Sequence, residues 1–384
     1  MKTAFLYPDF YDNTTATRRL LEAARDLFPD LEFYYWRRSV KADVKEDSIY
    51  EGIRKVSFDR QAPPRSWRIL LLTLQFQFWA LKQLRNSQPD AVFAFYIYSI
   101  LPALVYKYLF NRKSKVVYDL RDYFAVCFNF PFLIRFIFKL TDNFFIKFSD
   151  RVLFPDHQYF KHYGMFKLQD EKYFVLPNST IDKYSHIDTS PIHLKYDIPI
   201  GKKIVPLIGY FSEDRGRKMF FEAIGQKPDG IQFVVAGALR DNDDIAFFKS
   251  HSNVSFLGKL SYGEALSLMK QSLFVPMLCN PDKPNYKYAI PTKFYDSTMV
   301  GTPVLVSNGQ LDVCERIMQN GLGFKISYND TQAFLDLLAK LNKTGKSENT
   351  IEIRNYFIKN CDFGLFIPSF REFCKKIKDS DEVK

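Results

Sequence analysis

Short apolar runs alternate with segments of helical periodicity along most of this sequence, and this alternation restricts the fold more than any other feature. In the first part of the chain, strands are predicted at residues 3–7, 31–36, 91–96, 115–119 and 150–154. Helices are expected at residues 14–27, 65–86 and 99–111, with a basic, polar loop ending near residue 64. Strands separated by helices pair in parallel through right-handed crossovers. This part of the chain therefore predicts a Rossmann-like parallel sheet.

A second series of the same kind follows a stretch at residues 177–203 that is rich in Pro, Ser, Asp and Lys. Its predicted strands are 204–210, 231–236, 254–256, 273–276, 303–306 and 323–326. A chain of 384 residues is longer than one hydrophobic core usually serves. We therefore expect an α/β protein with two Rossmann-like domains facing each other across a cleft. The expected boundaries are 1–180 for the N-terminal domain, 181–203 for a linker and 204–360 for the C-terminal domain.

Composition excludes several other classes of protein. The balance of 47% hydrophobic and 25% charged residues is that of a folded chain, not a disordered one. The 5 cysteines are scattered and never form a C-x-x-C pair, which argues against a disulfide scaffold and for a reducing compartment. The first residues lack the basic-then-apolar layout of a signal peptide. We expect a cytoplasmic protein.

The net charge of +11 favours an anionic partner, and two segments narrow the choice. Residues 65–85 and 130–148 each combine a long apolar run with several Arg and Lys residues. Polar side chains interrupt both runs, so neither has the roughly 18–20 apolar residues of a membrane span. One interpretation is two helices buried against a sheet. The other is helices whose basic rims touch anionic lipid, which would place the protein peripherally on the inner face of the cell membrane.

Nucleic acid is not an expected partner, because the sequence contains no RNP, KH or helix-turn-helix pattern.

The segment around Pro291 is the strongest candidate site. Proline suits the first turn of a helix, and the N–H groups of that turn attract anions. Thr292 lies in this turn, and Lys293 adds a full positive charge for a diphosphate. Asp296 follows three residues later on the same helix face, where its carboxylate is placed to accept ribose hydroxyls. The alternative is a capped helix with a Lys/Asp pair on its surface.

Several motifs of the chain resemble those of one enzyme family. Pro291, Lys293 and Asp296 form a P-x-K-x-x-(D/E) pattern that is followed by G-T-P-V-L from residue 301. This arrangement resembles the nucleotide-sugar motif of family 4 glycosyltransferases, which have the GT-B fold. Further segments match that family in the same order, over roughly residues 1–345: PDAVFAFYIYSILPA, KVVYDLRDYF, DRVLFPDHQYFKHYG, FVLPNSTID, GYFSEDRGRKMFFEAI and NVSFLGKLSYGEALSLMKQS.

The sequence departs from the family pattern in three places. Tyr288 stands where the family often has a glutamate eight residues before the motif acid, which here is Asp296. Tyr210 stands where an arginine often follows the first glycine of the C-terminal domain, here Gly209. The loop at residues 7–13 lacks the usual pair of glycines. These departures concern the donor and the stereochemistry more than the fold.

The resemblance implies a glycosyltransferase that moves a sugar from a UDP- or GDP-sugar to a glycan or lipid-linked saccharide in surface polysaccharide synthesis. The N-terminal domain would bind the acceptor and the C-terminal domain the donor, and a helix within residues 361–384 would cross back to the N-terminal domain. The residues expected at the donor phosphates are Arg215, Lys293, Thr292 and Gly209. Those expected at the nucleoside are Asp296, Gly237, Gly258, Lys259 and Leu260.

In such a transfer, negative charge grows on the departing diphosphate. Arg215, which occupies the position of the family's diphosphate-binding lysine, would stabilise that charge together with Lys293 and the helix N–H groups. We therefore expect no metal ion and no cofactor besides the nucleotide-sugar donor.

The candidate general base is Asp122, which follows the predicted strand at 115–119. Its neighbours Asp119 and Arg121 would then form a structural pair. The residues expected to line the acceptor site are Tyr96, Tyr98 and Asp9.

Two alternatives share this architecture. One is a sugar-nucleotide 2-epimerase, although such an enzyme needs no basic, aromatic helices in its N-terminal domain. The other is a non-catalytic module that still binds a nucleotide or a glycan, and the absent glutamate at Tyr288 favours it.

Overall fold

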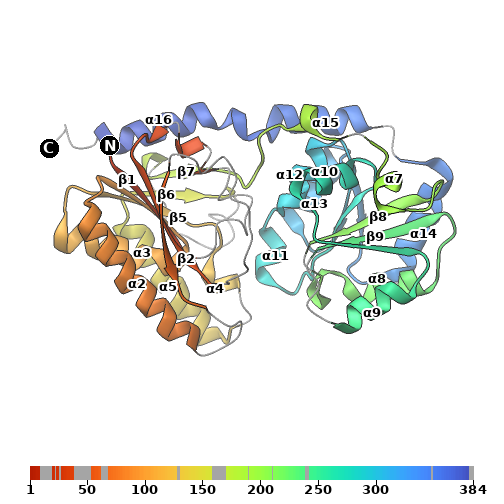
Figure 1. Cartoon of the computed structure of the whole chain (residues 1–384), viewed down its shortest axis with the longest axis horizontal. Helices are drawn as coiled ribbons and strands as arrows, with labels where there is room; N and C mark the ends of the chain where they lie inside the picture. The colour runs from red at the N-terminus through yellow and green to blue at the C-terminus, as the bar shows by residue number, and fades with distance from the viewer. Residues whose placement is uncertain are drawn as a thin grey trace. The chain divides into compact units, whose positions relative to one another are not determined.

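The computed structural model of the chain divides into two units, one formed by Met1–Pro177 with Gly364–Lys384 and the other by Asn178–Phe363 (Figure 1). The residues that it describes are 1–8, 20–21, 23–25, 27–38, 53–61, 68–127, 130–157, 170–188, 190–209, 211–237, 242–346 and 349–379. The predicted helix at 14–27 lies largely outside them.

A 7-stranded parallel sheet forms the centre of the first unit, in the order β3-β2-β1-β4-β5-β6-β7. Its strands are β1 (Thr3–Tyr7), β2 (Leu31–Arg37), β3 (Arg54–Asp59), β4 (Ala91–Phe95), β5 (Lys115–Asp119), β6 (Arg151–Phe154) and β7 (Tyr173–Val175). The strands at the centre are continuous apolar runs because helices cover both faces of such a sheet. Strand β3 corrects the sequence prediction of a loop up to residue 64. It is a half-exposed edge strand, and its charged, polar composition hides it in the sequence.

Helices of the first unit are α2 (Arg68–Ser87), α3 (Tyr96–Val105), α4 (Phe124–Cys127), α5 (Phe132–Phe148) and α16 (Ile367–Asp379), with a π-helix η3 at Tyr106–Phe110. Figure 1 shows α2, α3 and α5 along one side of the sheet. Helix α2 packs inward through Phe76, whose ring stacks at 5.6 Å on Trp36 of β2. The C-terminal helix α16 packs on β7, where Phe370 and Phe373 contact Phe174.

The second unit contains two 3-stranded parallel sheets, β10-β9-β8 and β11-β12-β13. Their strands are β8 (Lys203–Ile208), β9 (Ile231–Ala236), β10 (Val254–Gly258), β11 (Val275–Met277), β12 (Val304–Ser307) and β13 (Gly323–Ile326). A parallel bridge between Ile204 and Ser272 joins β8 to the segment that enters β11. The combined order, β10-β9-β8-β11-β12-β13, is the Rossmann order 3-2-1-4-5-6.

Helices of the second unit precede its first strand, lie between successive strands and follow its last strand. They are α7 (Ile192–Tyr196), α8 (Arg217–Gly225), α9 (Asn242–Ser250), α10 (Tyr262–Lys270), α11 (Pro284–Tyr288), α12 (Thr292–Met299), α13 (Leu311–Gln319), α14 (Thr331–Thr344) and α15 (Thr350–Asn360). Helix α10 begins at a capping box, in which Ser261 and Glu264 satisfy each other's backbone N–H groups.

Residues 181–203, which we expected to form a linker, belong to the second unit instead. Ile192 and Ile198 are buried in a cluster with Ile204 and Leu268. The Gln271 side chain also accepts a hydrogen bond of 2.9 Å from the N–H of Ile192. The polar composition of this segment hides these isolated isoleucines, which attach it to the unit's core.

Each unit has one point where the strand order reverses direction. It lies between β1 and β4 in the first unit, and between β8 and β11 in the second. In open parallel sheets, ligands bind beyond the carboxyl ends of the strands at such a switch point. Those ends are Tyr7 and Phe95 in the first unit and Ile208 and Met277 in the second.

Candidate functional site

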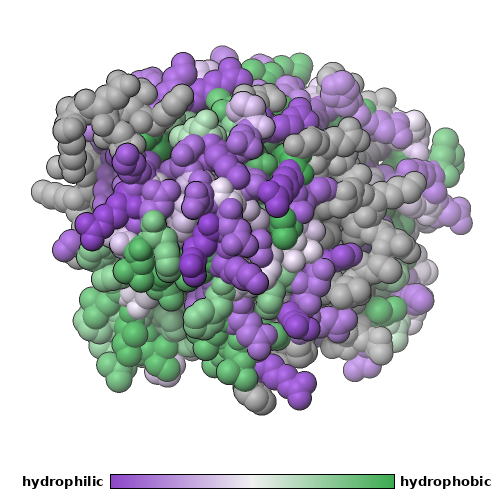
Figure 2. All heavy atoms as spheres, turned by 60° about the vertical axis from the view of Figure 1, so that its left-hand side comes forward, coloured by the Kyte–Doolittle hydropathy of each residue, from purple (hydrophilic) through white to green (hydrophobic). Residues whose placement is uncertain are grey.

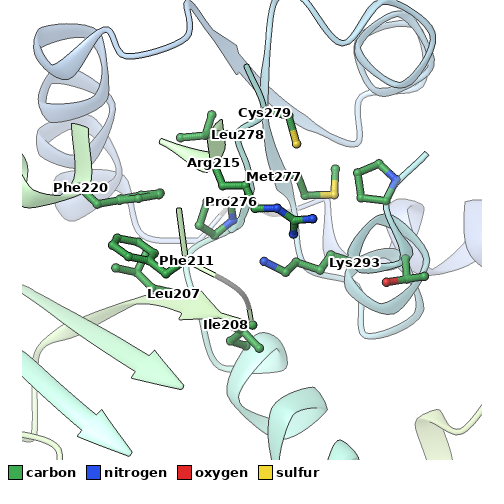
Figure 3. A pocket seen from close by; sticks show the side chains of 13 residues that line it. Leu207, Ile208, Phe211, Arg215, Phe220, Pro276, Met277, Leu278, Cys279 and Lys293 are labelled. Atoms are coloured by element: carbon green, nitrogen blue, oxygen red, sulfur yellow. The ribbon is translucent and has the colours of Figure 1, made fainter. Parts of the chain in front are cut away.

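A pocket of about 170 Å³ lies at the switch point of the second unit (Figure 3). The end of β8, the end of β11 with the residues that follow it, and the first turn of α12 form its walls. The residues that line it are Leu207, Ile208, Gly209, Phe211, Arg215, Phe220, Pro276, Met277, Leu278, Cys279, Pro291, Thr292 and Lys293.

Helix α12 is held with its first turn at the pocket. Pro291 is the N-cap residue of the helix and has an extended conformation. Buried residues of the helix, among them Phe294 and Met299, anchor it in the core of the unit. Thr292 and Lys293 are therefore fixed at the pocket, together with backbone N–H groups that have no partner within the helix.

Two cations share this pocket. The charged ends of Arg215 and Lys293 extend toward the same space (Figure 3). Burial at the pocket wall and, to a lesser extent, the charge of Arg215 lower the pKa of Lys293 to about 8, against weaker opposite effects of Cys279 and Asp296. Keeping two like charges together costs free energy unless an anion joins them. The arrangement suits a ligand with at least one full negative charge.

Two glycines let the strand ends approach each other closely beside the pocket. Gly237, after β9, has φ +144°, and a Cβ there would lie 2.6 Å from the carbonyl oxygen of Gly209. Gly209, after β8, has φ +96°, and its Cα lies close to the Lys293 side chain, since an added Cβ would be 3.7 Å from Cε. A side chain at Gly237 would displace the end of β8, whereas at Gly209 the positive φ is what disfavours any other residue.

At the switch point of the first unit, Tyr96 follows β4 with the uncommon φ of +59°. Its ring lies 6.1 Å from that of Tyr7, at the end of β1. Burial raises the pKa of Tyr96 well above its ordinary value, and the charges of Tyr7 and Asp122 act in the same direction. The charge of Asp122 therefore acts on the Tyr96 hydroxyl.

Solved structures of glycosyltransferases resemble this chain over nearly its whole length. Sucrose-phosphate synthase from Thermosynechococcus elongatus is 14% identical, with a TM-score of 0.77 and coverage of 99% of this chain and 100% of that one. HepE from Anabaena in complex with UDP is 14% identical, with a TM-score of 0.71 and coverage of 98% and 100%. WaaG, a glycosyltransferase involved in lipopolysaccharide biosynthesis, is 16% identical, with a TM-score of 0.64 and coverage of 96% and 98%. The chain has the GT-B fold.

No family model matches the sequence, and no curated protein matches it. The fold prediction of two Rossmann-like domains is confirmed by the GT-B neighbours. The narrower resemblance to family 4 stays a prediction.

Within this GT-B fold, the structure brings together the four residues expected at the donor phosphates: Gly209, Arg215, Thr292 and Lys293. The residues expected at the nucleoside are not among those that line this pocket. Gly237 and Gly258 stand at the ends of the neighbouring strands β9 and β10, outside the described lining of the pocket. Lys259 and Leu260 follow β10, and the Leu260 side chain packs against the core. Their contacts with a base stay predictions.

Asp296 differs most from its expected position. The residue is buried, and its carboxylate accepts a hydrogen bond of 2.6 Å from the Tyr262 hydroxyl. That contact comes from α10 and is invisible in the helix periodicity, which placed Asp296 and Lys293 on one open face. Binding of ribose by Asp296 stays a prediction.

Residues after β11 were not predicted to be part of the site. Leu278 and Cys279 line the GT-B pocket, and the N–H of Cys279 donates a hydrogen bond of 2.9 Å to the Ser307 hydroxyl. A signal for them existed in the sequence. The predicted strand at 273–276 is the fourth of its series, so in the Rossmann order its carboxyl end adjoins that of the first strand.

The structure brings together only some of the residues predicted at the acceptor site. Tyr98 packs edge-on against Phe124 at 5.5 Å, on the side of α4. Asp119 and Arg121 form a buried ion pair at 3.1 Å, which is the structural pair that the sequence suggested. Asp9 lies outside the described residues.

A metal site is absent from the described ranges, where no three His, Cys, Asp or Glu side chains come together. Catalysis without a metal stays a prediction.

Proposed function

We propose that this chain is a glycosyltransferase that transfers a sugar from a UDP- or GDP-sugar to a glycan or lipid-linked saccharide acceptor in surface polysaccharide synthesis. One observation carries the proposal most directly: Arg215 and Lys293 converge on a pocket at the switch point of a GT-B domain. The HepE structures, which contain UDP or UDP-glucose, support a nucleotide sugar as the donor.

The chemistry of the pocket fits a departing nucleoside diphosphate. As the glycosidic bond breaks, negative charge moves onto the diphosphate oxygens. Two cations and the first turn of α12 are already in place to stabilise this charge, so little reorganisation accompanies the reaction. The apolar wall formed by Leu207, Phe211 and Phe220 keeps part of the pocket dry, which strengthens these interactions.

A thermal-shift screen against UDP, GDP, ADP, CMP and buffer tests the donor class. A nucleotide at about 100 times its Kd adds about 2.7 kcal/mol of stability, enough to raise the Tm by several degrees. We expect a selective shift with UDP or GDP. No shift with any nucleotide would contradict the proposal, and a shift with ADP alone would require a different donor.

The affinity for UDP is expected to fall as the pH rises above about 8. Lys293 must be protonated to bind the diphosphate, and its pKa in the free protein is about 8. A bound anion raises that pKa, so binding is strongest below about 8 and weakens above it. Isothermal titration calorimetry from about pH 7 to 9 measures the trend, because the last phosphate proton, with a pKa of about 6, is lost below this range and the uracil ring stays largely neutral within it. A Kd that stays constant would show that Lys293 does not contact the diphosphate.

A further inference from the structure

Helices on one side of the first unit turn apolar side chains outward. In α2 the exposed leucines and phenylalanine are spaced i, i+1, i+4 and i+8, which places them within an arc of about 100°. The buried residues Phe76, Ala80 and Leu84 form a different face of this helix. The exposed apolar residues are Leu70, Leu71, Leu74 and Phe78 in α2, Tyr108, Leu109 and Phe110 in η3, and Phe132, Leu133, Ile134, Phe136, Ile137, Leu140, Phe144 and Phe148 in α5.

These residues form one surface, called here the α2–α5 surface. Helices α2 and η3 meet where the Arg85 guanidinium lies 4.5 Å from the centre of the Phe110 ring. The π-helix η3 and α5 meet where the Tyr108 hydroxyl donates a hydrogen bond of 3.0 Å to the carbonyl of Phe148. Figure 2 shows hydrophobic side chains gathered over the region where Figure 1 places α2 and α5. An exposed apolar patch of this extent marks an interaction site in a soluble domain.

The charges on this surface have a single sign. Residues 68–87, 106–113 and 132–148 contain one acidic residue, Asp142, and its side chain is fully buried. The exposed basic residues of the same segments are Arg68, Lys82, Arg85, Arg112, Lys113 and Lys147. No helix in the described part of the chain is long and apolar enough to cross a bilayer.

We propose that the α2–α5 surface docks the protein on an anionic lipid bilayer, with α2 and α5 lying along the membrane plane. The exposed Phe and Leu side chains enter the interface between headgroups and acyl chains, while Arg and Lys contact the lipid phosphates. Their aliphatic stems cover apolar surface as the charged ends reach the headgroups.

A second copy of the chain fits this surface less well. In a two-fold symmetric dimer the same patch meets itself, so Arg and Lys residues of both copies would face each other. The segments offer no exposed carboxylate to compensate them. A bilayer that contains anionic lipid supplies the missing charge.

Three widely spaced positions test the surface without touching the core. The exposed fractions are 82% for Phe132, 73% for Phe78 and 72% for Leu109. The triple variant Phe78→Ser, Leu109→Ser, Phe132→Ser is therefore expected to fold normally. Exposed apolar residues of the second unit provide a matched control, with 84% for Ile200, 75% for Leu194 and 72% for Ile351.

The experiment is co-sedimentation with vesicles of phosphatidylcholine alone or mixed with phosphatidylglycerol. We expect the wild type and the control triple variant (Leu194→Ser, Ile200→Ser, Ile351→Ser) to bind the anionic vesicles, and the surface variant to lose about 100-fold in affinity. High salt should weaken binding of the wild type.

Three results would overturn the proposal: wild-type protein that sediments with neither vesicle, a surface variant that binds like the control, or a wild-type dimer that the surface variant converts to a monomer without any change in vesicle binding. Circular dichroism establishes that each variant is folded. The assay needs no nucleotide and no turnover, so its failure is distinct from failure of the proposed transferase activity.

Discussion

Lys293→Met is expected to lower kcat for sugar transfer about 100- to 1000-fold and, at the same time, to raise the free energy of unfolding at pH 7. The loss in kcat follows because a charge aimed at the departing diphosphate is removed. The gain in stability follows because the ammonium is costly where it stands. Its pKa is lowered from 10.5 to about 8, chiefly by burial.

The pH dependence of the free energy of unfolding tests the predicted gain in stability. Between about pH 8 and 10.5, Lys293 is protonated in the unfolded chain but neutral in the folded one. Because the unfolded state then binds more protons, the wild type becomes more stable as the pH rises through this range. The rise should be smaller in Lys293→Met. Chemical denaturation at several pH values measures it.

Lys346 provides the matched control. Burial lowers its pKa to about 8 as well, but its ammonium donates hydrogen bonds to the carbonyl of Lys270 at 2.7 Å and to the Thr302 hydroxyl at 2.8 Å. Lys346→Met would leave these acceptors without their donor, so we expect lower stability and an unchanged kcat. If Lys293→Met behaved in the same way, its role would be structural and the assignment of the phosphate site would be wrong.

The order of strands and helices could be predicted from sequence because buried parallel strands are continuous apolar runs. The same order identifies the switch point, and with it the position of the Pro291–Lys293 turn. Arg215 was predicted only through the family resemblance, since a basic residue after a predicted strand has no pattern of its own. The structure places it beside Lys293 because Gly216, with φ +76°, packs its turn against Leu278.

What the sequence left open depends on contacts between distant segments. The apolar residues of α2 and α5 fit a buried helix and a membrane-facing helix equally well, because periodicity does not say which side meets the sheet. In α2, Phe76 packs on Trp36 of the sheet, so that face of the helix is buried and Leu70 and Phe78 are exposed to solvent. Asp296 is a similar case, since its partner Tyr262 lies 34 residues away.

Asp122→Asn is expected to lower kcat about 100- to 10,000-fold with no change in the affinity for UDP. The aspartate follows β5, the strand next to β4, and its charge acts on the Tyr96 hydroxyl. A carboxylate there can accept the proton of an acceptor hydroxyl, whereas the isosteric amide cannot. UDP binding is expected to stay the same because the donor pocket is formed entirely by residues of the second unit.

Asp119→Asn tests whether the loss of any negative charge near β5 lowers kcat, or only the loss of the Asp122 carboxylate. Asp119 forms a buried ion pair with Arg121, so its replacement leaves the guanidinium without that partner and should lower the Tm. Asp122→Asn should leave the Tm nearly unchanged. A variant that keeps its rate would show that another group takes the proton.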